Sequence, residues 1–439
     1  MEIDKLGCWH RTHYSNGINP RLNGKEVTVL GWVREIRDLG GIRFLILQDT
    51  EGTVQITVPQ SEVNKETLSK ASTLQRQYCI GVRGVVKEMD KAPGGAEIIP
   101  NEIRILGVAK QPLPIDITGK TPADIDIRLD ARVIDLRRDE NQAVFKIRHA
   151  TLEATREFLS KKGFIEVNTP KIIASATEGG AALFPVAYFE REAFLAQSPQ
   201  LYKEQLTIDF EKVFEIGPVF RAEKSHTRRH VTEFVSIDIE EAFATAEDVM
   251  KVAEELMQFV CGFAKDRCQR ELKILRREID VPTTPFKRFT YDEVLRELAE
   301  EDIKISWGED LPTPAYRALG EIHPYFYFIV DWPTSLKPFY IKPKDDKPEI
   351  SEGFDLMWRW IEIASGGTRV HDKDLLVKRL EEQGLSPESF GYHVQAFDYG
   401  MPPHAGWAIG LERLVMMLTG RRNIREVILF PRDRFRLTP

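Results

Sequence analysis

The sequence VFRAEKSHTRRHVTEF, residues 219–234, predicts two strands joined by a basic loop. Arg221 and Glu223 lie two residues apart before the loop, and the second strand carries Thr232, Phe234, Ser236, Asp238 and Glu240 at every second position. Because side chains alternate along a strand, each set lies on one face. The opposite face of the second strand holds Val231, Val235, Ile237 and Ile239, with Glu233 as the exception. The polar face is therefore either a wet surface or the floor of an active site.

The loop between these strands, residues 224–230, is more positive than a plain hairpin needs. It contains Lys224, His226, Arg228, Arg229 and His230. Such a loop suits a polyphosphate, because arginine binds phosphate through a fixed bidentate fork. Composition alone favours the alternative of a solvated basic loop.

The order of these residues resembles motif 2 of the class II aminoacyl-tRNA synthetases. The match is Phe220-Arg221-Ala222-Glu223, then the basic loop, then Glu233-Phe234. This resemblance implies that Arg221 holds the α-phosphate of ATP, that Glu223 reads the adenine amino group and that Phe234 stacks on adenine. It also implies that Arg229 and His230 belong to the ATP site.

Composition predicts a soluble chain of two or three domains. The chain has 439 residues, of which 42% are hydrophobic and 29% are charged,. The first ten residues do not form a secretory signal, and no apolar run is long enough to span a bilayer. Four scattered cysteines without metal-ligand spacing fit a reducing cytoplasm,. The net charge of −7 does not favour nucleic-acid binding, so such binding must depend on local residues,.

Residues 20–108 predict an OB-fold barrel of five strands with one helix. Strands are expected at 26–36, 42–48, 53–58, 78–87 and 96–106, and the helix at 63–75,. Many such barrels bind nothing. However, GWVREIRDLGG, Phe44 and Gln55 resemble the anticodon-binding domain of the aspartyl, asparaginyl and lysyl synthetases. That resemblance implies that Phe44 stacks on an anticodon base, and that Arg37 and Gln55 bind base edges.

The predicted domains are an anticodon-binding domain at 1–108, a hinge at 109–130 and a catalytic domain at 131–439. Residues 109–130 contain proline and turn residues without sustained periodicity,. Apolar residues at helical spacing then run from Val144 to Phe158, Gly163 supplies a stop, and a strand at 164–169 follows,. A helix packed in its own core would explain this pattern. It also resembles motif 1, which implies a homodimer.

Two stretches resemble the amino-acid site of the family. Residues 175–181 are small except for Glu178, and the resemblance makes them a loop that closes over the substrate,. In Ser198-Pro199-Gln200-Leu201-Tyr202-Lys203, the ammonium of Lys203 suits a substrate with a side-chain carboxylate,. The resemblance implies aspartate as that substrate, with its ammonium bound by Glu178, Gln200 and Asp238 and with Ser198 in the same site.

The remaining chemistry lies in the last ninety residues. Asp355 and Glu362 are carboxylates able to hold Mg²⁺, and Ser365 adds a hydroxyl, although two acids near a Gly-Gly turn are often only a polar loop,. The resemblance assigns Glu362 to Mg²⁺ on the ATP phosphates, and Ser365 and Arg369 to aspartate. Arg413 lies in the first turn of a helix after Gly410, where anions are favoured. This resembles motif 3, which implies that Arg413 holds the γ-phosphate and that Gly410 lines the ATP site.

Together these motifs resemble the aspartyl-tRNA synthetases of the archaeal and eukaryotic type. The implied fold is α+β, an OB-fold barrel followed by an antiparallel sheet flanked by helices. The implied reaction joins L-aspartate to tRNA-Asp through an aspartyl-adenylate, with ATP as substrate, Mg²⁺ as cofactor and Arg221 and Arg413 as the catalytic cations.

The tRNA range is the main alternative left open. In the subfamily, strict enzymes carry Trp and Lys at the places of Arg34 and Pro93, and relaxed ones, which also charge tRNA-Asn, carry His and Pro. Pro93 favours the relaxed range, whereas Arg34 matches neither pattern. Lys203 disfavours an asparaginyl enzyme, and the barrel disfavours a tRNA-independent asparagine-forming paralogue. The cations and carboxylates together disfavour a non-catalytic RNA-binding paralogue.

Overall fold

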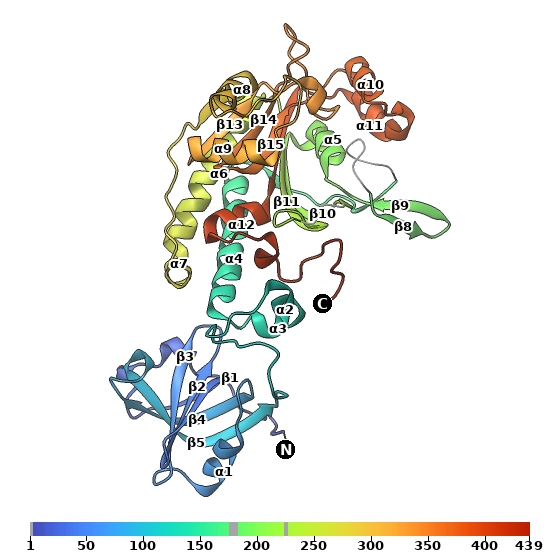
Figure 1. Ribbon diagram of the computed structural model, residues 1–439. Helices are drawn as coiled ribbons and strands as arrows, with labels where there is room; N and C mark the ends of the chain where they lie inside the picture. The colour runs from blue at the N-terminus through green and yellow to red at the C-terminus, as the bar shows by residue number, and fades with distance from the viewer. Residues whose placement is uncertain (1–2, 175–182, 224–226) are drawn as a thin grey trace. The chain divides into compact units, whose positions relative to one another are not determined.

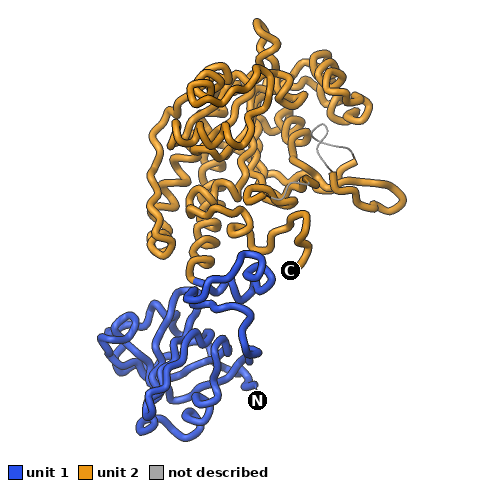
Figure 2. The backbone as a smooth tube through the Cα atoms, viewed as in Figure 1, with its two compact units in different colours: residues 1–138 blue, residues 139–439 orange. Residues whose placement is uncertain are grey.

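The computed structural model describes residues 3–174, 183–223 and 227–439. The chain forms two compact units, Met1–Arg138 and Asp139–Pro439 (Figure 2). Each unit has its own apolar core. The predicted division at residues 108 and 130 stays a prediction, since compactness marks only the boundary after Arg138.

The first unit is built around a closed barrel with the strand order β1-β2-β3-β5-β4 (Figure 1). Its elements are β1 (Glu26–Asp38), β2 (Ile42–Gln48), β3 (Thr53–Pro59), α1 (Lys65–Thr73), β4 (Cys79–Glu88) and β5 (Ala96–Gly107). The prediction of five strands with a helix between the third and fourth is confirmed. The helix starts at Lys65 because the side chain of Asn64 accepts a hydrogen bond from the Thr67 amide and caps it,.

Part of the expected hinge is helical. The helices α2 (Ile125–Asp130) and α3 (Arg132–Asp135) end the first unit, and Asp124 caps α2. The buried carboxylate of Asp135 pairs with Arg128 at 2.9 Å and with Arg132 at 2.8 Å. Short 3-10 turns complete this unit at Ser15–Gly17, Pro20–Leu22 and Pro93–Gly95.

The second unit contains an eight-stranded sheet in the order β12-β13-β14-β15-β16-β11-β10-β6. Its strands are β6 (Ile165–Glu166), β10 (Lys212–Phe220), β11 (Glu233–Ala242), β12 (Lys287–Thr290), β13 (Phe326–Val330), β14 (Gly353–Trp358), β15 (Ile361–Thr368) and β16 (His404–Gly410). The six strands from β13 to β10 pair antiparallel, as predicted. The two edge strands, β6 and β12, pair parallel with their neighbours, so the complete sheet is mixed.

Helices pack on this sheet and enclose the larger core. The helices α4 (Asp139–Lys161), α6 (Ala246–Arg267) and α12 (Leu411–Thr419) bury apolar side chains in one cluster with the strands. The other helices of the unit are α5 (Gln200–Phe210), α7 (Gln269–Leu275), α8 (Tyr291–Glu300), α9 (Thr313–Ile322), α10 (Lys373–Glu382) and α11 (Gly391–Ala396). Short 3-10 turns lie at Thr334–Leu336, Pro387–Phe390, Phe397–Tyr399 and Ile424–Val427. No described helix has both the length and the apolar character needed to cross a membrane.

A small separate sheet completes the second unit. Its order is β7-β9-β8, with β7 (Ile172–Ile173), β8 (Pro185–Tyr188) and β9 (Arg191–Leu195). The hairpin of β8 and β9 projects away from the large sheet (Figure 1). Immediately after β9, the chain enters the segment that leads into α5.

Candidate active site

The polar face of β11 is a buried floor and not a wet surface. Ser236, Asp238 and Glu240 are 7%, 1% and 0% exposed. Strand register places Asp238 opposite Ala408 of β16, Ala408 opposite Ser365 of β15, and Ser365 opposite Asp355 of β14. Directly opposed residues share a face of the sheet. Four strands therefore bring residues more than a hundred positions apart into one row.

A second row, next to the first, is made almost entirely of glycine. Glu240 lies opposite Gly406, which lies opposite Gly367, which lies opposite Gly353. A Cβ on Gly406 would lie 2.3 Å from a carboxylate oxygen of Glu240. The absence of side chains beside Glu240 therefore leaves room on this part of the floor for the carboxylate and its partners.

A cavity of about 170 Å³ lies on this face and gathers every residue that the sequence assigns to ATP. These residues are Arg221, Glu223, Arg229, His230, Phe234, Glu362, Gly410 and Arg413, and Ser236 and Ser365 line the same space. Arg221, Glu223, Arg229 and His230 lie in the connection between β10, which ends at Phe220, and β11, and the others come from β11, β15, β16 and the start of α12. Lys224 and His226 lie outside the described residues. The arrangement is consistent with one nucleotide site, and the role of each residue stays a prediction.

The arginines of this cavity are held by specific neighbours. The guanidinium carbon of Arg221 lies 5.5 Å from the centre of the Phe234 ring. Arg413 donates to the backbone carbonyl of Glu362 at 2.9 Å and lies 3.4 Å from its carboxylate. Arg413 is the third residue of α12, where free backbone N–H groups also favour an anion,.

The basic side chains here are crowded enough to disfavour their charged forms. Burial, Arg413 and Arg317 lower the pKa of Arg229 below its ordinary value. Burial also lowers the pKa of His230, and Arg413 and Arg229 add to the effect, although Glu223 opposes it. A polyanion in this cavity would relieve the repulsion among these groups.

A buried cluster of two cations and two carboxylates lies further along the same face. Lys203 pairs with Asp238 at 2.9 Å and with Glu240 at 3.4 Å, and it donates to the carbonyl of Trp407 at 3.3 Å. Arg369 holds both oxygens of Glu240, at 2.8 Å and 3.2 Å. From its sequence, Glu240 was predicted only to lie on a polar strand face, because periodicity does not show which cation a carboxylate meets.

Within the described part of the chain, two of the buried polar groups without a hydrogen-bond partner belong to this cluster or to the residues just before α5, which carries Lys203. One is the second carboxylate oxygen of Asp238, and the other is the side-chain amide of Gln197. Buried polar atoms are rarely left so. A ligand ammonium near Asp238 would satisfy the carboxylate. Gln197 was missed by the sequence analysis, although it directly precedes Ser198.

The other residues assigned to the amino acid have protein partners. The side-chain amide of Gln200 donates to Glu204 at 2.6 Å, and the backbone N–H of Gln200 donates to the Ser198 hydroxyl at 3.3 Å. Glu204 is fully buried, with one carboxylate oxygen 3.4 Å from His393 and 3.6 Å from His404. Gln200 is therefore tied to a buried carboxylate and histidine group. Glu178 lies outside the described residues.

The expected magnesium ligands differ in their surroundings. Both oxygens of Asp355 accept from Lys337 at 2.9 Å, and burial raises the pKa of Asp355 even though Lys337 opposes the effect. Glu362 is partly exposed and lines the ATP cavity together with Ser365. Among the described residues, no group of three His, Cys, Asp or Glu side chains could hold a metal. Glu362 and Ser365 nevertheless fit Mg²⁺, which commonly takes one or two carboxylates and completes its shell with phosphate and water.

The anticodon residues predicted in the barrel lie mostly on one outer face. Arg37 of β1 lies opposite Phe44 of β2, and Phe44 lies opposite Thr57 of β3. Gln55, two positions before Thr57, donates to Glu97 of β5 at 2.9 Å, and Thr57 donates to the same carboxylate at 2.5 Å. Arg34 is half-buried, and Pro93 is exposed in the turn before β5. Glu97 was not foreseen, because its pairing with Gln55 depends on barrel closure.

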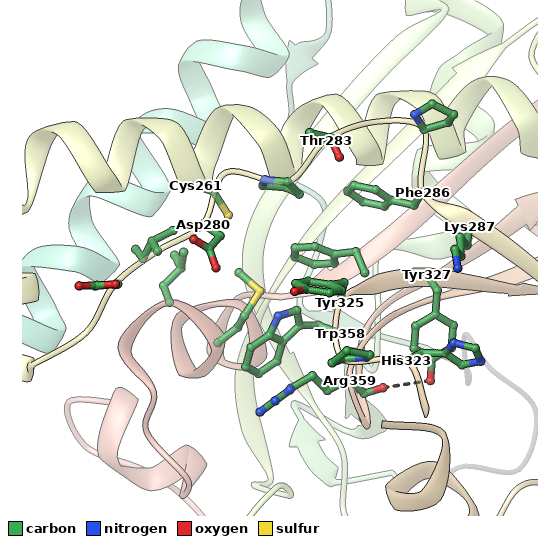
Figure 3. A pocket seen from close by; sticks show the side chains of 18 of the residues that line it. Cys261, Asp280, Thr283, Phe286, Lys287, His323, Tyr325, Tyr327, Trp358 and Arg359 are labelled. Atoms are coloured by element: carbon green, nitrogen blue, oxygen red, sulfur yellow. Dashed lines mark hydrogen bonds between the residues drawn. The ribbon is translucent and has the colours of Figure 1, made fainter. Parts of the chain in front are cut away.

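A larger cavity of about 770 Å³ lies elsewhere in the second unit. Figure 3 shows Tyr325, Trp358 and Phe286 around it. None of the residues that the sequence assigns to ATP, aspartate or metal lines this space. A choice of site by cavity volume alone would therefore miss the cavity where the arginines and carboxylates converge.

Comparison with known proteins agrees with this geometry. The family of class II tRNA synthetases (D, K and N) matches residues 124–434, and the OB-fold nucleic acid binding domain matches residues 27–106. The chain therefore belongs to the class II tRNA synthetases.

Its relatives narrow the class further. The chain is 55% identical to the aspartate–tRNA(Asp/Asn) ligase of Methanopyrus kandleri, over 97% of this chain and 99% of that protein. It is 52% identical to the ligase of the same name from Methanothermobacter thermautotrophicus, over 99% and 100% of the two chains. Among solved structures, an aspartyl-tRNA synthetase from Entamoeba histolytica has a TM-score of 0.89 at 33% identity, covering 100% of this chain and 96% of that one. Asparaginyl-tRNA synthetase from Pyrococcus horikoshii, complexed with asparaginyl-adenylate, has a TM-score of 0.92 at 34% identity, covering 98% and 100%.

Proposed function

We propose that this protein joins L-aspartate to both tRNA-Asp and tRNA-Asn in an ATP-dependent reaction. The observation that carries the choice of aspartate is the buried pairing of Lys203 and Arg369 with Asp238 and Glu240 beside the cavity that gathers the predicted ATP residues. The relatives named aspartate–tRNA(Asp/Asn) ligase support the same substrates.

The two buried cations give the site its preference for a carboxylate side chain. Lys203 and Arg369 are already charge-balanced by Asp238 and Glu240, so the site does not have to bury isolated cations,. An incoming side-chain carboxylate would share these cations. The free oxygen of Asp238 is suited to the substrate ammonium, and we propose that Glu178 and Gln200 assist.

Asparagine would be a poorer ligand for this site. Its uncharged amide cannot replace a carboxylate between two cations, which form their strongest hydrogen bonds with ionised acceptors. The close structural similarity to an asparaginyl enzyme reflects the common fold. We therefore assign side-chain selectivity to Lys203 and Arg369.

The first step forms aspartyl-adenylate. The α-carboxylate of aspartate attacks the α-phosphorus of ATP, the bond to the bridging oxygen breaks, and pyrophosphate leaves. Arg221 is proposed to hold the α-phosphate, Arg413 the γ-phosphate, Phe234 and Glu223 the adenine. The protein supplies position and positive charge, and no side chain needs to act as nucleophile.

Mg²⁺, when bound, supplies further positive charge to the ATP phosphates. Glu362 and Ser365 are the residues proposed to hold it. Asp355, bound to Lys337, is better placed to orient Ser365, its partner across the strands, than to take a metal itself.

The second step transfers aspartate to RNA. A terminal ribose hydroxyl of tRNA attacks the carbonyl carbon of the aspartyl-adenylate. The bond from this carbon to the phosphate oxygen breaks, and AMP leaves. We propose that the outer face of the barrel reads the anticodon, with Phe44 as a stacking platform and Arg37 and Gln55 as hydrogen-bonding groups. Arg34 and Pro93 are proposed to lie near the third anticodon base.

We also propose that the enzyme acts as a cytoplasmic homodimer. Ile165 and Ile172 are 47% and 51% exposed, and β6, which contains Ile165, is the outer strand of the large sheet. Exposed apolar residues on a sheet edge favour pairing with another chain. Sedimentation of Ile165→Asp would test this assignment, since a charge there should release monomers.

The deciding experiment compares transfer of labelled aspartate to tRNA-Asp and tRNA-Asn transcripts, with labelled asparagine as the control. The proposal expects both tRNAs to accept aspartate and neither to accept asparagine. Charging of tRNA-Asp alone would overturn the relaxed range. Transfer of asparagine, or of neither amino acid, would overturn the roles of Lys203 and Arg369.

A further inference from the structure

Within residues 243–330, the helix α9 contacts a residue that lines the ATP cavity. Thr313 is the first residue of α9, and its hydroxyl accepts a hydrogen bond from Arg229 at 3.0 Å. Arg229 belongs to the basic loop, 84 positions earlier in the chain. The helix is therefore in direct contact with a residue proposed to bind ATP.

A second contact comes from the turn between β14 and β15. The guanidinium carbon of Arg229 lies 4.6 Å from the centre of the Trp360 ring, and that of Arg317, from α9, lies 5.6 Å from it. An arginine over an indole face gains electrostatic and packing energy. Arg229 is thus held by a hydroxyl at one point and by an aromatic surface at another.

The helix and the turn are packed closely enough to move as one support. A Cβ on Gly320 of α9 would lie 2.7 Å from the backbone nitrogen of Trp360. Only glycine permits this approach without displacing the turn. Arg359, the preceding residue, has a left-handed backbone with φ of +54°. A shift of α9 would therefore displace both contacts to Arg229.

A cavity of about 170 Å³ joins this support to the nucleotide site. It is lined by Thr313, Tyr316 and Trp360 together with Arg229, His230, Glu362 and Arg413. The last four residues also line the ATP cavity described above. The support and the proposed phosphate-binding residues therefore border the same space.

Arg229 needs such a support because its neighbours repel it. Arg413 and Arg317 both disfavour its charged form, in addition to burial. A long arginine side chain also loses considerable rotamer freedom when it is fixed. The contacts with Thr313 and Trp360 therefore favour one position of the guanidinium.

We infer that Thr313 and Trp360 are positioning residues that hold Arg229 in place for the polyphosphate of ATP. They act through Arg229 and need not touch ATP. The inference deepens the proposed function and rests on the ATP-binding role of Arg229. It gives the segment 243–330 a task in the first step of the reaction, the formation of adenylate.

The test measures aspartate-dependent ATP/pyrophosphate exchange in Thr313→Val, Thr313→Ser, Trp360→Leu and Trp360→Phe. Thr313→Val should raise the KM for ATP by roughly threefold to tenfold, as expected for one hydrogen bond to a partly exposed cation, with the KM for aspartate unchanged. Thr313→Ser should restore the wild-type value, and Trp360→Phe should be closer to wild type than Trp360→Leu. Thr283→Val and Trp307→Leu, in the same segment but away from Arg229, are the matched controls and should not change the KM for ATP.

A double-mutant comparison separates positioning from a general structural effect. In an Arg229→Ala background, Thr313→Val should raise the KM for ATP no further. Additive effects, an equal change in the KM for aspartate, or no effect of Thr313→Val would overturn the inference alone. Absence of exchange in the wild-type protein would overturn the proposed function and this inference with it. Thr313 is exposed, so its variants should fold, and their KM for ATP tests the inference even if Trp360→Leu does not fold.

Discussion

The ammonium nitrogen of Lys203 lies 2.9 Å from a carboxylate oxygen of Asp238, and both side chains are almost completely buried. The pair joins α5 to β11 of the large sheet, between residues 35 positions apart in the chain. Glu240 and Arg369 extend it into a cluster in which every charge has an opposite neighbour. The cluster is therefore part of the fold as well as a candidate binding site.

Lys203→Met is expected to reduce both stability and activity. Removal of the ammonium leaves the buried Asp238 carboxylate without a cation and leaves Glu240 with Arg369 alone, which should lower the free energy of unfolding by about 3–5 kcal/mol,. Aspartate-dependent exchange should fall by at least roughly a hundredfold. Urea unfolding and exchange assays measure the two effects. Lys203→Arg keeps the charge and should recover part of the stability, so equal losses in both variants would contradict the electrostatic explanation.

Arg413→Lys should impair catalysis without affecting the fold. The lysine keeps a positive charge but loses the planar fork for phosphate, so kcat/KM for exchange should fall by about a hundredfold. Thermal unfolding should be unchanged, because the side chain is partly exposed. Arg421→Lys, just after the other end of α12, is the matched control and should retain activity within about twofold. A large loss in the control would mean that α12 itself is sensitive to substitution.

Phe44→Leu should weaken recognition of the anticodon alone. Loss of one base stack costs about 1–3 kcal/mol, so the KM for full-length tRNA should rise by roughly fivefold or more. ATP/pyrophosphate exchange should not change, because Phe44 belongs to the first unit and the exchange residues to the second. Charging of a minihelix without an anticodon serves as the control. If minihelix charging fell equally, the barrel face would not be the site of anticodon contact.

Pro93→Lys should narrow the tRNA range. The third anticodon base is cytosine for aspartate and uracil for asparagine, and cytosine offers an unprotonated ring nitrogen where uracil has an N–H. A lysine ammonium donates and does not accept, so it favours cytosine. Charging of tRNA-Asn relative to tRNA-Asp should fall by about tenfold in paired assays. An unchanged ratio would place this turn outside the recognition of that base.

Glu204→Gln should make the free energy of unfolding vary less with pH in the acid range. Burial acts to raise the pKa of Glu204, but His393 and His404 outweigh it and hold the pKa well below its ordinary 4.5. Because the folded-state pKa is the lower one, the carboxylate stabilises the fold above about pH 4.5, and this stabilisation is lost as the pH falls toward the folded-state pKa. Urea unfolding should show wild type more stable than the variant by about 3 kcal/mol at pH 6, a difference that narrows by about 1 kcal/mol at pH 3.5. A difference that stayed constant would contradict the lowered pKa.

The elements of the fold were largely predictable, because each depends on local patterns. Alternating side chains marked β11, helical spacing marked α4 and α12, and Gly163, with φ of +84°, ends the turn after α4. The barrel strands agree with the predicted ranges to within two residues. The parallel edge strands were not foreseen, since hydrophobic periodicity carries no information on strand direction.

The partners of the site residues were much less predictable. Asp355, predicted to bind metal, lies in a buried pair with Lys337, a residue that no local pattern distinguished. Glu240 and Glu97 were each one of many acidic residues until strand pairing placed Arg369 and Gln55 beside them. No local sequence pattern marked Thr313 or Trp360 as a neighbour of the ATP site, because their contact with Arg229 depends on how α9 packs on a distant turn.

The sequence by itself determined the kinds of residue at the site and the faces on which they lie, since side-chain period and the chemistry of phosphate and carboxylate binding act over a few residues. Tertiary structure decided which charges neutralise one another and which remain for a substrate. The cluster of Lys203, Asp238, Glu240 and Arg369 combines residues from α5, from β11 and from the position directly after β15. The energy of a buried charge depends on everything packed around it, so these pairings exist only once the sheet has formed.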